Sequence, residues 1–129
     1  MRLLLDTHVL LWLRLDDPRL GPAALAMVRA PENTVLVSIA SIWEIAVKVR
    51  IGKLALELDR LLDDNRRAGF VRLDVTDNHL RTLRQLPLVP GHRDPFDHLL
   101  IAQAITEDLV FLSNDAWVAN YPVRFQATA

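Results

Sequence analysis

Two carboxylates, Asp94 and Asp97, lie three residues apart at the expected start of an apolar helix. Asp94 suits the N-cap, Pro95 suits the first helical position, and acids in the first turn favour the helix dipole. From Phe96 onward apolar residues recur at helical spacing, so that Asp97 shares a face with Leu100 and its successors. A solvated charge is not normally placed at the head of a buried stripe. Asp97 is therefore the first candidate for a functional acid.

Three more acids stand where apolar strands are expected to end or where helices are expected to begin. In a parallel sheet with right-handed crossovers, the carboxyl ends of strands and the amino ends of helices meet at one edge, where such sheets bind ligands. We therefore expect these acids to join Asp97 at that edge. They are Asp6 after the run 3–5, Glu44 in the helix that follows the run 34–37, and Asp115 after the run 109–112.

Each acid also fits a purely structural role. Asp6 and Asp115 could be N-caps, and Ser41 to Glu44 matches a capping box. Taken together, however, four acids at one edge would repel each other unless a cation lay between them, and Mg²⁺ or Mn²⁺ prefers such oxygen ligands. One or two such ions suit phosphodiester hydrolysis, because they lower the pKa of a bound water and neutralise charge on the phosphate.

Four further side chains could support this site. Thr7 and Ser113 carry hydroxyls beside the candidate acids, and Asp94 could act from outside the ligand set. Lys48 lies four residues after Glu44, so it could restrain that carboxylate or reach a phosphate instead. His8 and His98 neighbour candidate acids, but adjacent residues of a helix point about 100° apart, so we expect both to face elsewhere.

The elements that must position these residues alternate between strands and helices, which is typical of an α/β protein. We expect a central, mostly parallel sheet of about five strands covered on both faces. The expected strands lie at 3–5, 34–37, 70–73, 109–112 and 123–125. The expected helices lie around 9–13, 22–30, 38–51, 58–67, 76–86, from 95 onward, and 116–121.

Composition limits the remaining possibilities. The chain has 129 residues, which fits one domain over 1–129, and 51% of them are hydrophobic, enough for a full core. A net charge of −1 predicts no overall positive potential that would attract nucleic acid. The absence of cysteine excludes thiolate chemistry. No apolar run approaches the roughly 18 residues of a membrane span. Met1 and Arg2 lead at once into the first strand, so we expect no signal peptide and a cytoplasmic protein.

The sequence resembles PIN-domain ribonucleases, specifically the toxin component of VapBC-type toxin–antitoxin pairs. Four blocks in the order of the family carry this resemblance and span nearly the whole chain. They are Leu4–His8, Ser41–Lys48 with Gly52–Leu54, Arg93–Asp97 running into Leu100–Ala104, and Leu112–Asp115.

The resemblance implies a three-layer α/β/α PIN-like fold and a metal-dependent endoribonuclease. By position, it assigns the acidic cluster of the family to Asp6, Glu44, Asp97 and Asp115, which would bind Mg²⁺ or Mn²⁺ and activate water to cut single-stranded RNA. It also implies a cognate antitoxin that covers the acids, and a homodimer. Asp97 rather than Asp94 holds the position of the family acid, directly before the small and apolar residues of the helix.

Two other functions stay open at this point. A receiver-like phosphoryl-accepting domain also uses acids, Mg²⁺ and a parallel sheet, but no lysine follows position 53, and Thr7-His8 stands where paired acids would be needed. A haloacid-type phosphatase is not one of the two, because it needs a second aspartate at position 8, which is His. The chain could also be a non-catalytic PIN-fold module that only binds a partner, although the four acids argue against this.

Overall fold

A parallel sheet of five strands organises the chain in the computed structural model, which describes residues 1–129. The strand order is β3-β2-β1-β4-β5, and every neighbouring pair is parallel. The strands are β1 (Arg2–Leu5), β2 (Thr34–Ser38), β3 (Val71–Leu73), β4 (Val110–Leu112) and β5 (Phe125–Gln126). The helices are α1 (Thr7–Arg14), α2 (Pro22–Arg29), α3 (Ile39–Arg50), α4 (Leu58–Arg67), α5 (Asp77–Arg84), α6 (Pro95–Thr106) and the short 3₁₀ helix η1 (Ala116–Asn120).

The central strand β1 explains why the first apolar run of the sequence does not alternate with polar residues. Leu3 and Leu5 pack into one hydrophobic core, while Leu4 packs into a second core on the other face. Leu4 pairs with Leu36 of β2 and with Phe111 of β4. A strand buried on both faces requires such a continuous run.

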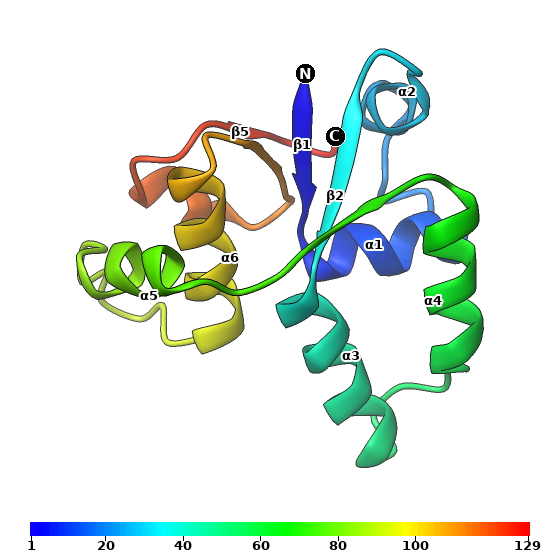
Figure 1. The fold of residues 1–129 in the computed structure, drawn as a ribbon, viewed down its shortest axis with the longest axis horizontal. Coiled ribbons are helices and arrows are strands. Elements are labelled where there is room, and N and C mark those ends of the chain that lie inside the picture. Colours follow the sequence, from blue (N-terminus) through cyan, green and yellow to red (C-terminus); the bar gives the residue numbers. More distant parts are fainter.

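Helices cover both faces and produce three layers. In Figure 1, α1, α2 and α4 lie on one side of the strands and α5 and α6 on the other. The first core combines side chains of β1 and β2 with α1, α2, α3 and α4, and the second combines β1 and β4 with α6 and η1. The expected three-layer α/β/α architecture with a parallel sheet is therefore confirmed.

Polar side chains fix where three of the helices begin. Asp6 accepts a hydrogen bond from the Thr7 amide at α1, and Ser38 accepts one from the Ala40 amide at α3. Asp94 caps α6, as its place before Pro95 predicts. The sequence boundaries agree with the structure to within a few residues.

One expected strand is slightly shifted, and one local expectation is wrong. The last strand is Phe125–Gln126 rather than 123–125, because the chain pairs with β4 only once it has passed the turn after η1. The capping-box alternative at Ser41 fails because α3 already begins at Ile39, after Ser38. The capping box lies instead at α5, between Thr76 and His79. None of the helices combines the length and the hydrophobicity that crossing a membrane requires.

Replacing Leu100 with alanine should destabilise the protein by about 2–5 kcal/mol, because the change leaves a cavity in the second core. Leu100 is fully buried on the helix that carries Asp97. Urea unfolding followed by circular dichroism measures the effect. Leu88→Ala is the matched control, since Leu88 is 97% exposed. Equal losses in the two variants would contradict the packing described for α6.

Candidate metal centre and active site

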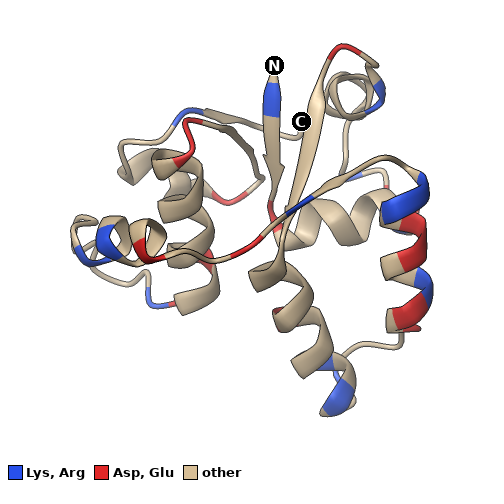
Figure 2. Cartoon of the chain, in the orientation of Figure 1, with Lys and Arg blue, Asp and Glu red and all other residues tan.

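The four candidate acids converge on the carboxyl edge of the sheet. Asp6 directly follows β1, Asp115 follows β4, Asp97 lies in the first turn of α6, and Glu44 faces inward from α3. The charges of the other three all act on Asp97. Figure 2 shows an acidic segment where β1 ends and another on α3, Lys and Arg toward the outer end of α3, and both kinds of charge on α4 and α5.

Asp97 has the most unfavourable environment of the group. Its side chain is 19% exposed. Burial, followed by the charges of Asp6, Asp94, Asp115 and Glu44, raises its pKa to about 8. Without a cation this carboxyl therefore keeps its proton at neutral pH. A strongly raised pKa at a cluster of like charges is a frequent mark of a functional site.

Hydrogen bonds hold both oxygens of Asp6. Oδ1 accepts from the Thr7 amide at 2.7 Å, and Oδ2 accepts from the Ser113 hydroxyl at 2.7 Å. Burial raises the pKa of Asp6, although these two hydrogen bonds and the nearby His8 counteract the rise. The carboxylate is thus fixed in orientation while its charge remains uncompensated by any ion pair.

Ser113 links two of the acids. While its hydroxyl donates to Asp6, its oxygen accepts from the Asp115 amide at 3.1 Å. Asp115 in turn uses Oδ1 to cap η1 through the Trp117 amide, at 2.9 Å. Asp6 and Asp115 also line one surface cavity of about 280 Å³. The strand end at β4 therefore sets the separation of these two carboxylates.

The two carboxylate oxygens of Glu44 have different surroundings. Lys48 donates to its Oε2 at 2.8 Å, so the lysine restrains this carboxylate. Glu44 Oε1 is buried and has no hydrogen-bond partner. A buried carboxylate oxygen without a partner is costly, unless a cation approaches it.

The remaining candidates have local roles. Asp94 Oδ1 accepts from the Phe96 and Asp97 amides, which is the capping role. The Thr7 hydroxyl donates to Ser41 and not to an acid. His98 points away from the acids, as expected, and its Nε2–H donates to the His92 carbonyl at 3.0 Å. His8 is exposed, but it lines the same cavity as Asp6 and Asp115.

Sequence reasoning missed His92. This side chain is only 7% exposed, and its Nε2 lies 3.3 Å from Asp97 Oδ2. Ligand atoms of His92, Asp97 and Asp115 all lie within 4.8 Å of one another. His92 sits in a loop, where no periodicity indicates which way a residue points. Its place five residues before Asp97 is the one local signal that could have drawn attention to it.

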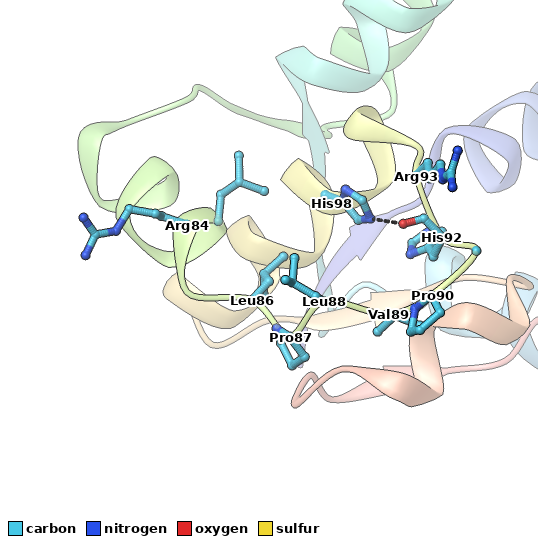
Figure 3. A pocket seen from close by; sticks show the side chains of 11 residues that line it. Arg84, Leu86, Pro87, Leu88, Val89, Pro90, His92, Arg93 and His98 are labelled. Carbon is cyan, nitrogen blue, oxygen red and sulfur yellow. Dashed lines mark hydrogen bonds between the residues drawn. The ribbon is translucent and has the colours of Figure 1, made fainter.

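The loop that carries His92 also forms a cavity of about 440 Å³ beside the acids. Figure 3 shows its walls, which come from the segment between α5 and α6 and from His98. The lining includes Arg84 and Arg93 and contains no acidic residue. His92 belongs both to this cavity and to the acidic cluster, so it forms the wall between them.

The residues at the edge fit a hard divalent cation. The candidate ligands are carboxylate oxygens, with the His92 imidazole beside them, and such oxygens suit Mg²⁺ and Mn²⁺. The partnerless Glu44 Oε1 and the repelled Asp97 carboxyl are both groups that a cation would stabilise. The arrangement can therefore hold a divalent cation.

Two solved structures share the fold of this chain. A chain in the crystal structure of VapBC2 from Rickettsia felis bound to a DNA fragment from their promoter superposes with a TM-score of 0.76, at 15% identity and 100% coverage of both chains. A chain of the DNA-bound VapBC from Salmonella typhimurium gives 0.66 at 15% identity, over 100% of this chain and 99% of that one. At such identities the likeness shows the fold alone. No curated protein sequence matches the chain.

The family comparison covers almost the entire sequence. The model of the PIN domain matches residues 3–122, a span that contains all four candidate acids and both hydrophobic cores. PIN domains are in general nucleases. From this match and the parallel α/β/α fold we conclude that the chain belongs to the PIN-domain family.

Proposed function

We propose that this protein is a Mg²⁺- or Mn²⁺-dependent endoribonuclease, built as a single PIN domain, and the toxin component of a type II toxin–antitoxin pair. The observation that carries the proposal is the position of Asp97, a buried carboxyl surrounded by Asp6, Glu44 and Asp115 at one edge of the sheet. A nuclease that works through metal ions needs such a concentration of carboxylates.

Asp6, Glu44, Asp97 and Asp115 are the residues that would hold the metal. When bound, the ion supplies a more acidic water and offsets the negative charge that develops on the phosphate. The partnerless Glu44 Oε1 is available for this role, whereas its Oε2 is occupied by Lys48.

The other residues contribute by holding these acids still. Ser113 and the Thr7 amide fix the two oxygens of Asp6, and Lys48 fixes the outer oxygen of Glu44. Asp94 fixes the first turn of α6 and hence the direction of Asp97. Polar groups that are already oriented need little rearrangement when charge develops at a phosphate, which is a large part of enzymatic rate enhancement.

The proposed substrate is single-stranded RNA, and the proposed partner is an antitoxin. The sequence resemblance to VapC-type toxins supports this role, as does the likeness of the fold to chains from two VapBC structures. The antitoxin would cover the acidic edge and so keep the nuclease inactive in the cytoplasm. We also propose that the free toxin is a homodimer.

Purified wild-type protein, free of any partner, should cleave RNA in the presence of Mg²⁺ or Mn²⁺. Asp6→Asn and Asp97→Asn should each lower the rate by about 100-fold or more, because the lost charge interaction is worth several kcal/mol. Gel analysis of a labelled RNA measures the cleavage. Asp63→Asn is the matched control, since Asp63 is exposed on α4 and pairs only with Arg66. Equal activity of the wild type and both site variants would overturn the proposal.

The metal-free protein should become less stable as the pH rises, in part because of Asp97. Its pKa rises from an ordinary 3.8 to about 8 in the folded protein, so between these values the folded state holds a proton that the unfolded chain has released. The stabilising contribution is therefore complete below about pH 4 and is lost as the pH approaches and passes about 8.

Asp97→Asn removes this effect and should raise the stability of the metal-free protein at about pH 9, and by clearly less at about pH 5. Urea unfolding in the presence of a chelator at both pH values gives the comparison, and Asp63→Asn again serves as the control. A variant no more stable than wild type at the higher pH would show that Asp97 is not repelled by its neighbours.

Expression of the wild-type chain alone in bacteria should arrest growth, and Asp97→Asn expressed to the same level should not. The growth curve after induction measures this, with immunoblotting to confirm equal protein levels. Growth arrest by both proteins would separate toxicity from the acidic site and contradict the proposed toxin mechanism. RNA cleavage without growth arrest would leave a ribonuclease that is not a toxin.

A further inference from the structure

His92 contacts both nearby residues and residues from beyond β4. Its ring stacks on that of Trp117, with centroids 5.4 Å apart and planes within 8°. Its Nδ1 lies 2.7 Å from the hydroxyl oxygen of Tyr121, and its Nε2 lies 3.3 Å from Asp97 Oδ2. The His98 side chain donates to its backbone carbonyl, a contact that Figure 3 shows at the rim of the loop. The imidazole therefore has one defined orientation.

The partners of the ring determine which nitrogen carries the proton. Tyr121 is 6% exposed, and the only hydrogen bond of its hydroxyl is the one to His92 Nδ1. When a bound cation has ionised Asp97, the Tyr121 O–H donates to Nδ1, Nε2 bears the hydrogen and donates to the Asp97 carboxylate, and all three groups are satisfied. In the other tautomer, the Tyr121 hydrogen has no acceptor and two bare lone pairs, on Nε2 and on Asp97, face each other.

We propose that His92 is a positioning residue of the metal centre, with its Nε2–H directed at Asp97 and its tautomer set by Tyr121. This inference rests on the proposed metal centre and adds a residue that acts on it through Asp97. Histidine that orients a ligand in this way has a substantial effect, because loss of a partner behind a ligand commonly lowers metal affinity about 10- to 100-fold.

A neutral donor suits this position better than a cation would. It fixes the direction of the Asp97 carboxylate without cancelling its charge, so the attraction for a divalent ion is kept. The stacking on Trp117 and the contact with the buried Tyr121 hold the imidazole in the position that faces Asp97. The loop at 86–93 thus adds His92 to the site formed by the acids.

The test measures binding of Mg²⁺ and of Mn²⁺ by isothermal titration, in the absence of RNA. His92→Leu should lower the affinity for both ions by the same factor, about 10- to 100-fold. His92→Gln should stay close to wild type, because its amide N–H can still donate to Asp97. Tyr121→Phe should give a smaller loss, and adding it to His92→Leu should cause no further loss, since the tyrosine acts only through the histidine.

Two controls keep the test decisive. Asp63→Asn changes an exposed carboxylate on α4, away from the site, and should leave both affinities close to wild type, which excludes an unspecific effect of substitution. Unfolding in the presence of a chelator shows whether each variant is folded. If His92→Leu does not fold, Tyr121→Phe, which loses only a hydroxyl, tests the proposal in its place. Nitrogen-15 NMR of the His92 ring in the metal-bound wild type should show Nε2 protonated and Nδ1 bare.

Each contrary result has a distinct meaning. Wild-type affinity in folded His92→Leu, or an Nδ1–H tautomer in the metal-bound protein, would overturn the role of His92 while leaving the metal centre intact. A larger loss for Mn²⁺ than for Mg²⁺ would make the imidazole a direct ligand, which also overturns the proposal, because nitrogen ligands favour Mn²⁺. Failure of the wild type to bind either ion would overturn the metal centre and this inference together.

Discussion

The repulsion between buried carboxyl groups at one edge of the sheet is the constraint on which the site depends. Charges a few ångströms apart in a partly dehydrated region interact by several kcal/mol, and burial adds a further penalty for each ionised group. Asp97 shows both effects, because burial and four neighbouring acids act on it in the same direction. Such an arrangement reduces the stability of the protein, so its persistence at a structured edge is best explained by a bound cation during function.

The topology of the sheet explains why the acids meet at this place. From β1 the chain moves to β2 on one side, and later returns to place β4 on the other side of β1. Ligands of open parallel sheets bind where the strand order reverses in this way, outside the carboxyl ends of the strands. Asp6 ends β1, and Ser113 follows β4 directly, so their hydrogen bond spans the reversal point. The same feature that packs two cores around β1 thus brings the acids together.

The features that local patterns encode could be predicted from the sequence. The apolar run in β1, the cap at Asp94 and the pairing of Lys48 with Glu44 at a spacing of four all depend on residues close in the chain. His92 could not be predicted in this way, since Trp117 and Tyr121 reach it from beyond α6 and β4. The capping-box alternative at Ser41 failed because Ser38, three residues earlier, already ends a strand and caps the helix.

The partners that surround the acids fit the proposed metal centre. A cationic side chain beside Asp6 or Asp97 would lower the repulsion between the acids. It would also weaken the negative potential that attracts a metal ion. The side chains in contact with these two acids are therefore a hydroxyl, from Ser113, and an imidazole, from His92. Both orient a carboxylate without neutralising it. Lys48 is the one ammonium in contact with the cluster, and it binds only one oxygen of Glu44, so the second oxygen remains free to face a metal ion.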